Sequence, residues 1–180
     1  MINIQHATIE TTLPTDEDIH TWVDAVLKLA VEMNTDSISE KQNAQTLLRA
    51  AELSPNSNPN TLRSNSDIEL TVRIVDEEEI IELNRRYRGQ EKATNVLSFP
   101  CELPESLGLN LLGDIVVCAP VVKSEADSQH KEHQAHWAHM IVHGTLHLLG
   151  FDHVSETQAL KMESLETRVL AHLGFPDPYH

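Results

Sequence analysis

Three histidines near the carboxyl terminus constrain this chain more than any other feature. They lie in the segment His143-Gly-Thr-Leu-His147-Leu-Leu-Gly150-Phe-Asp-His153. Because residues four apart share one helix face, the spacing predicts a helix that presents His143 and His147 side by side. A third ligand two turns further along the same helix would lie roughly 12 Å from the first, since a helix rises ~1.5 Å per residue. The chain must therefore turn back, and Gly150 can end the helix in a left-handed conformation that returns His153 to the other two.

This spacing predicts a metal site. Three neutral imidazoles can bind one ion and leave a fourth, tetrahedral position open, which is typical of a catalytic zinc. The pattern His-x3-His-x5-His also matches the metzincin proteases, which place a general-base glutamate directly after the first histidine. Gly144 occupies that position here, and glycine cannot accept a proton. We therefore predict one Zn²⁺ per chain, held by His143, His147 and His153, without the usual peptidase mechanism.

Residues beside these histidines are candidates for supporting roles. His139 lies one turn before His143 but two turns from His147, so we expect a helix cap or a hydrogen bond to His143 rather than direct metal binding. Asp152 could orient an imidazole, act as a base or form the turn before His153; the sequence leaves these alternatives open. Three earlier histidines are expected to face solvent: His130, His133 and His136.

The length and the two cysteines indicate one domain in a reducing compartment. A chain of 180 residues can bury its own core, so we expect residues 1–180 to form a single domain. Cys101 and Cys118 lie among apolar residues and are expected to be reduced. The amino terminus lacks the pattern of a signal peptide, and no apolar run is long enough to cross a membrane. These features predict a cytoplasmic location without membrane contact.

Charge restricts how the chain could bind nucleic acid. The net charge is −15, from 28 acidic and 13 basic residues, which argues against a general nucleic-acid binder. The one dense basic block runs over residues 85–92. It could be a solvated helix end favoured by the helix dipole, or Arg88 could stabilise the negative charge of a phosphodiester transition state. Sequence spacing alone leaves both interpretations of the basic block open.

The order of predicted elements indicates an α+β domain. Strands are expected over residues 2–10 (at a sheet edge), 68–75, 94–100 and 111–118 (central). Helices are expected after Thr15, over 76–87, from about 125 or later to 149, and over 155–173. We expect a small mixed twisted sheet of about four strands packed with four to five helices, with the metal site on the central helix. A polar stretch at about 35–66 predicts an insertion, mobile in part.

The histidine segment also resembles one family. Residues 143–153 are similar to the signature H-G-x-L-H-L-x-G-(Y/F)-D-H of the YbeY family of bacterial rRNA maturation endoribonucleases. Three shorter pieces occur in the expected order: Tyr87-Arg-Gly89, Thr94-Asn-Val-Leu-Ser-Phe-Pro100 and Leu112-Gly-Asp-Ile115. The similarity covers about residues 1–33 and 67–180. The chain departs from the family in its long 35–66 segment and in Ala93, where many members have proline.

The resemblance implies a zinc-dependent endoribonuclease that cleaves single-stranded RNA in rRNA processing, including maturation of the small-subunit rRNA 3′ end, and in ribosome quality control. It assigns zinc to the three histidines and RNA hydrolysis to Arg88, and it leaves Asp114 as a candidate for partner contact or structure. Implied partners are single-stranded rRNA, small-subunit proteins and assembly factors. Two alternatives are a metallohydrolase of another substrate and a non-catalytic ribosome-assembly factor with a structural zinc.

Overall fold

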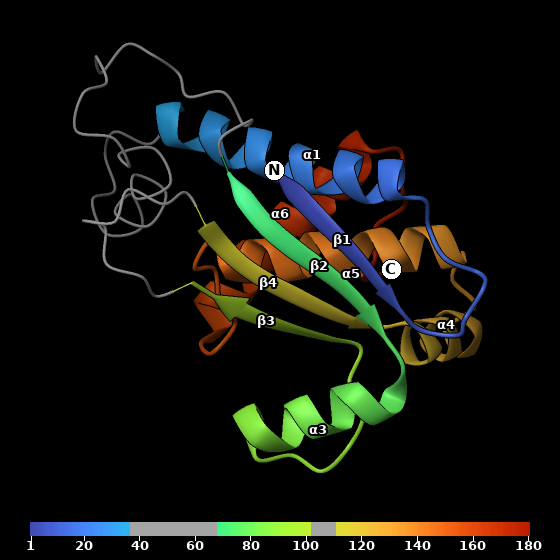
Figure 1. Cartoon of the computed structure of the whole chain (residues 1–180). Coiled ribbons are helices and arrows are strands. Elements are labelled where there is room, and N and C mark those ends of the chain that lie inside the picture. Colours follow the sequence, from blue (N-terminus) through green and yellow to red (C-terminus); the bar gives the residue numbers. More distant parts are fainter. Residues whose placement is uncertain (37–67, 102–110) are drawn as a thin grey trace.

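A four-stranded mixed sheet is the frame on which the helices pack (Figure 1). The computed structural model describes residues 1–36, 68–101 and 111–180. The strands are β1 (Ile2–Ala7), β2 (Glu69–Val75), β3 (Val96–Pro100) and β4 (Leu111–Cys118), in the spatial order β1-β2-β4-β3. β2 runs parallel to both β1 and β4, and β3 runs antiparallel to β4. The predicted edge position of the first strand and central position of strand 111–118 are both confirmed.

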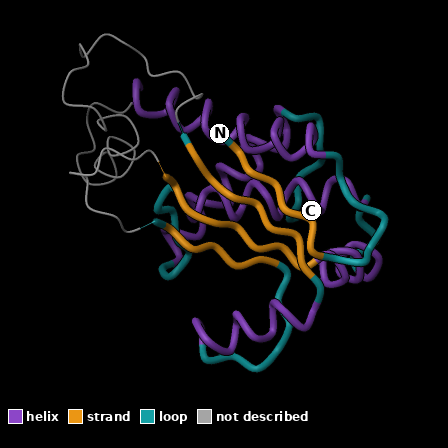
Figure 2. Tube along the Cα trace, in the orientation of Figure 1, coloured by secondary structure: helices purple, strands orange, loops and turns teal. Residues whose placement is uncertain are grey.

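Five helices pack on the sheet in the described part of the chain: α1 (Asp16–Asp36), α3 (Glu77–Arg88), α4 (Ala119–Ser128), α5 (His133–Leu148) and α6 (Glu156–His172). Figure 2 shows α3 apart from the others, at one end of the opposite sheet face. Two apolar clusters reflect this arrangement. The larger joins one sheet face to α1, α4, α5 and α6, and the smaller joins the other face to Ile80 of α3. The predicted α+β class, with four strands and four to five helices, is confirmed.

Helix α5 contacts more of the fold than its neighbours do, because it touches β3, β4, α1, α4 and α6. It approaches the sheet closely at Gly144. A Cβ atom at this position would lie 2.9 Å from Ile115 Cγ2 and 3.2 Å from Ser98 Oγ. The Ser98 hydroxyl also donates a hydrogen bond of 3.1 Å to the Gly144 carbonyl. There is therefore no room at this position for the glutamate that a metzincin would carry.

The helix expected from about residue 125 is in fact two helices. Glu125 belongs to α4, and α5 begins only at His133. The break falls in a turn where His130 adopts a φ of 53°. No glycine or proline marks residues 129–132, so the sequence carried no strong sign of the break. A start at residue 125 was wrong, whereas a later start and the predicted end of the helix agree with α5.

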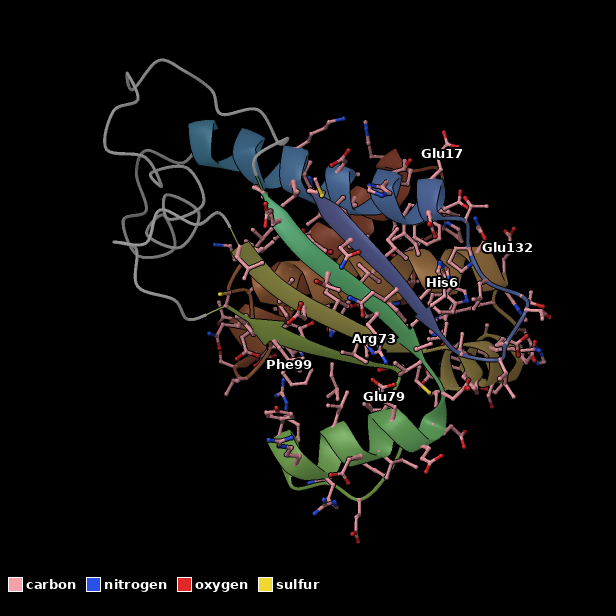
Figure 3. The ribbon with its side chains drawn as sticks, viewed as in Figure 1. His6, Glu17, Arg73, Glu79, Phe99 and Glu132 are labelled. Carbon is pink, nitrogen blue, oxygen red and sulfur yellow. The ribbon has the colours of Figure 1, made fainter. Side chains whose placement is uncertain are left out.

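Helix α3 carries the three arginines of the basic block and has defined contacts at both ends. It begins after Asp76 and ends at Gly89, whose φ of 67° is left-handed. The Asp76 carboxylate does not cap the helix; it accepts hydrogen bonds from the Thr8 hydroxyl and from the Ile9 N–H at 3.2 Å. Figure 3 shows Arg73 of β2 and Glu79 of α3 pointing toward one another. The guanidinium donates two hydrogen bonds to the carboxylate, of 2.7 and 3.0 Å. These contacts hold α3 against the sheet.

The last helix, α6, lies within its predicted range of 155–173. Ser155 and Gln158 form a capping box at the start of α6, and Gly174 follows its end with a φ of 85°. The predicted insertion at about 35–66 lies outside the described residues apart from its first two positions, which belong to α1. Within the described ranges, no helix combines the length and the apolar character needed to cross a membrane.

Candidate metal centre and its cleft

The fold brings His143, His147 and His153 together. The first two lie one turn apart on α5, and the chain turns at Gly150, where φ is 85°, to return His153 to them. One candidate ligand atom from each residue lies within 4.8 Å of the other two. The ring centroids are 4.6 Å (143–147), 5.1 Å (147–153) and 5.7 Å (143–153) apart. The three residues form a group that could hold a metal ion, and their role as ligands stays a prediction.

Hydrogen bonds on the outer nitrogens define which atoms this group offers. His143 Nδ1 lies 2.7 Å from the Glu166 carboxylate, and His147 Nδ1 lies 3.0 Å from the Phe151 carbonyl oxygen. Both partners are acceptors, so each Nδ1 carries a proton, and in the neutral ring the Nε2 atom is the one that presents a lone pair. The two Nε2 atoms are only 3.1 Å apart. At this distance the two nitrogens can share one proton as a hydrogen bond, or one metal ion as its ligands.

The spacing of these nitrogens fits zinc. With Zn–N bonds of ~2.0–2.1 Å, tetrahedral geometry separates two ligand nitrogens by about 3.3 Å. The protonation state fits as well. Burial lowers the pKa of His147 to about 4, and the neighbouring His143 and His153 add to this shift. Since metal binding requires neutral imidazole, His147 is in its binding form at neutral pH.

Glu166 of α6 completes the group, and the sequence reasoning missed it. Its side chain is fully buried and accepts hydrogen bonds from His143, from His139 Nε2 at 3.3 Å and from the Tyr179 hydroxyl. Burial by itself would raise the pKa of Glu166, but the three hydrogen bonds outweigh it and lower the pKa to about 2. The expected cap or hydrogen bond from His139 to His143 was wrong, because His139 bonds Glu166 instead.

The earlier histidines differ from one another. His136 is 3% exposed, so the expectation that it faces solvent was wrong. Its Nε2 lies 2.9 Å from Glu125 of α4, which packs against the start of α5. His130 is exposed, and the half-buried His133 pairs with Asp127 at 2.7 Å.

Asp152 and Asp114 lie in different surroundings. The Asp152 carboxylate accepts a hydrogen bond of 2.8 Å from the backbone N–H of His153. This geometry matches the turn-forming alternative. Asp114 is exposed on β4 next to Ile115, which points into the α5-side core. Because neighbouring strand residues alternate between faces, Asp114 points to the opposite face of the sheet, away from the histidines.

One cleft joins the histidines to the basic block. It has a volume of about 560 Å³ and is lined by Arg88, by β3 and the residues before it, and by all three histidines. Arg88 ends α3, and its Nη2 makes a long hydrogen bond of 3.5 Å to the Ser98 carbonyl. Two neighbouring arginines have other partners: Arg85 pairs with Glu82, and Arg86 lies over the Tyr87 ring. A negatively charged group in the cleft would lie between a guanidinium and the candidate metal centre.

Fold and site together define an α+β protein with a three-histidine candidate metal centre and an arginine in the same cleft. The family model described as Endoribonuclease YbeY matches residues 28–174. The chain is 44% identical to the Endoribonuclease YbeY of Colwellia psychrerythraea over 179 residues, which covers 99% of this chain and 96% of that protein. The chain belongs to the YbeY endoribonuclease family.

A solved structure is similar in fold. The solution structure of a Thermotoga maritima protein matches with a TM-score of 0.50 and 22% sequence identity, over 96% of this chain and 91% of that one. At this identity the likeness supports the fold alone.

Proposed function

We propose that this protein is a zinc-dependent endoribonuclease that cleaves single-stranded RNA during rRNA processing. The observation that carries the proposal is the shared cleft, in which Arg88 and the three histidines line one volume. Relatives named as endoribonucleases support a phosphodiester of RNA as the bond that is cleaved.

The three histidines would hold the ion, and their closeness supports this, since one possible ligand nitrogen from each lies within 4.8 Å of the other two. When bound, zinc activates water and polarises a phosphoryl oxygen. Arg88 would donate hydrogen bonds to the phosphate oxygens, on which negative charge builds in the transition state. Its guanidinium makes a single long hydrogen bond in the described structure, to Ser98 O, so a phosphate can replace this contact at little cost.

Peptidase action is disfavoured by the residue after the first histidine. A metzincin requires a glutamate there, and Gly144 is packed against Ile115 and Ser98 with no space for a longer side chain. We therefore place phosphodiester hydrolysis ahead of the alternative metallohydrolase function.

The acidic surface bears on how RNA reaches the cleft. A net charge of −15 disfavours binding of free RNA at physiological salt. We propose that ribosomal partners in the cytoplasm, namely small-subunit proteins and assembly factors, present the single-stranded rRNA to the cleft. We further propose that the protein acts in small-subunit 3′ end maturation and in ribosome quality control. Asp114, exposed on the sheet face opposite α5, is the candidate residue for such a partner.

The test is cleavage of a labelled single-stranded rRNA fragment, free and within small subunits, by zinc-loaded protein. We expect a chelator to abolish cleavage and Arg88→Ala to slow it by about 10²–10³-fold, the usual cost of one charge-stabilising donor. Arg85→Ala is the matched control, because Arg85 belongs to the same basic block but pairs with Glu82. Intact RNA on both substrates, from protein that still binds ribosomes, would favour the assembly-factor alternative.

A further inference from the structure

We propose that Glu166 and Tyr179 form a positioning pair for His143, so that the carboxyl-terminal segment is part of the metal centre. Neither residue would touch the ion or the RNA. The inference rests on the metal binding proposed above and adds two residues that act through His143.

The first step is the orientation of the His143 ring. A carboxylate on the outer nitrogen of a metal-binding histidine fixes the tautomer, holds the ring plane and strengthens the inner nitrogen as a ligand. Glu166 meets this requirement, since its Oε1 lies 2.7 Å from His143 Nδ1. The contact joins α5 to α6, so the position of α6 controls the direction of the His143 lone pair.

The second step is the support of Glu166 itself. Its side chain is 1% exposed, so solvent cannot complete its hydrogen bonds. Two further donors do so: His139 from α5 and the Tyr179 hydroxyl from the segment after α6. Tyr179 therefore holds one oxygen of the carboxylate while His143 uses the other.

The third step is the anchoring of the segment that carries Tyr179. Phe175 packs edge-on against Trp22 of α1, with ring centroids 6.1 Å apart. Lys131 Nζ donates a hydrogen bond of 2.6 Å to the Pro178 carbonyl. The Tyr179 N–H bonds the Asp177 carboxylate at 3.0 Å. These contacts hold the segment over the outer side of α5, where the hydroxyl reaches Glu166.

A second metal site is the competing interpretation, because His139, His143 and Glu166 also lie close enough together to hold an ion. Two observations oppose it. His143 Nδ1 is occupied by its proton toward Glu166, and its other nitrogen faces His147. The Glu166 carboxylate is already shared among three hydrogen-bond donors. The group is therefore the outer support of the three-histidine centre.

The experiment measures zinc affinity by competition with a chromophoric chelator. Glu166→Gln keeps the size of the side chain but removes its charge, and should weaken zinc binding by about 10–100-fold. Tyr179→Phe should weaken it in the same direction by a smaller factor. Glu163→Gln and Tyr87→Phe are the matched controls and should bind zinc like the wild type. Glu163 lies three residues earlier on α6 and bonds no histidine among the described contacts, and Tyr87 packs on Phe99.

A purely structural role would give a different result. It would lower the melting temperature of the metal-free protein and leave zinc affinity, and the visible spectrum of the Co²⁺-substituted protein, unchanged; that outcome would overturn the inference. If Glu166→Gln does not fold, Tyr179→Phe decides, because Tyr179 is 46% exposed and loses only a hydroxyl. The assay needs no RNA. If zinc affinity depends on Glu166 but the protein never cleaves RNA, the proposed function is refuted and the positioning pair is not. If the wild type binds no zinc, both are refuted.

Discussion

Adding one methyl group at Gly144 tests how closely α5 packs on the sheet. In Gly144→Ala the new carbon would lie 2.9 Å from Ile115 Cγ2 and 3.2 Å from Ser98 Oγ. Ile115 is fully buried in the central strand β4, so its side chain has little freedom to move away. Either the helix or the strand must shift by a few tenths of an ångström.

Two opposing free energies decide the size of the effect. Overpacking a core by a methyl group costs ~1–3 kcal/mol, and alanine is about 1 kcal/mol better than glycine within a helix. We expect a net loss of about 1 kcal/mol in the free energy of unfolding. For a chain of this length that corresponds to a melting temperature lower by ~2–4 °C.

Urea denaturation of the metal-free protein, followed by fluorescence of the buried Trp22 and Trp137, measures the change. A double-mutant cycle with Ser98→Ala provides the control, because removing Oγ relieves one of the two contacts. In the Ser98→Ala background, Gly144→Ala should lower the free energy of unfolding by less than it does in the wild type. If Gly144→Ala instead raised the free energy of unfolding by about 1 kcal/mol in both backgrounds, helix propensity alone would explain the change. The close packing of α5 on the sheet would then be refuted.

Three further predictions concern stability. Gly113→Ala should lower the free energy of unfolding by more than ~2 kcal/mol, because φ is +137° and the methyl group would lie 2.2 Å from the Phe99 carbonyl oxygen. An unchanged midpoint of urea denaturation would contradict this. Ser155→Ala should cost ~1 kcal/mol through loss of the capping box at α6, whereas Ser164→Ala on the exposed side of the same helix should be near neutral. The metal-free protein should lose stability as pH falls from 6.5 to about 4, because the pKa of His147 is lower in the folded than in the unfolded chain, so the unfolded chain binds the proton first. His147→Gln should flatten that part of the curve of melting temperature against pH, and equal slopes would count against the burial argument.

The gathering of the three histidines could be predicted because it depends on local geometry. Two lie on one helix turn, and Gly150 produces the return that brings in the third. The place of Arg88 could not be predicted in this way. It depends on how α3 packs against β3, and about 55 residues separate Arg88 from His143 in the sequence.

Glu166 was missed although the sequence carries a sign of it. The buried face of α6 is formed by Met162, Leu165, Val169 and Leu170, and position 166 falls among them. A glutamate on an apolar helix face must find hydrogen-bond donors inside the protein. The donors come from α5 and from the carboxyl-terminal segment. Helix periodicity could therefore indicate that Glu166 has a hydrogen-bond partner, but it could not identify the partner.

His136 and the start of α5 were misjudged for a shared reason. The sequence from 125 to 149 has no strong helix breaker, so one long helix with a polar start was the simple interpretation. In the structure the chain doubles back at His130, and α4 covers the first turns of α5. Helix α4 therefore buries His136 against Glu125. The periodicity of a single helix could not have predicted this contact.

Ser98 has a consequence for anyone who wishes to redesign the cleft. Its carbonyl oxygen accepts a hydrogen bond from Arg88 and its hydroxyl donates one to the backbone of α5, so one residue of β3 contacts the elements on both sides of the cleft. A change of the opening therefore has to preserve or replace both contacts of Ser98. Variation in the size of the cleft is better sought at Thr94 and Asn95, which lie in the cleft wall just before the strand begins.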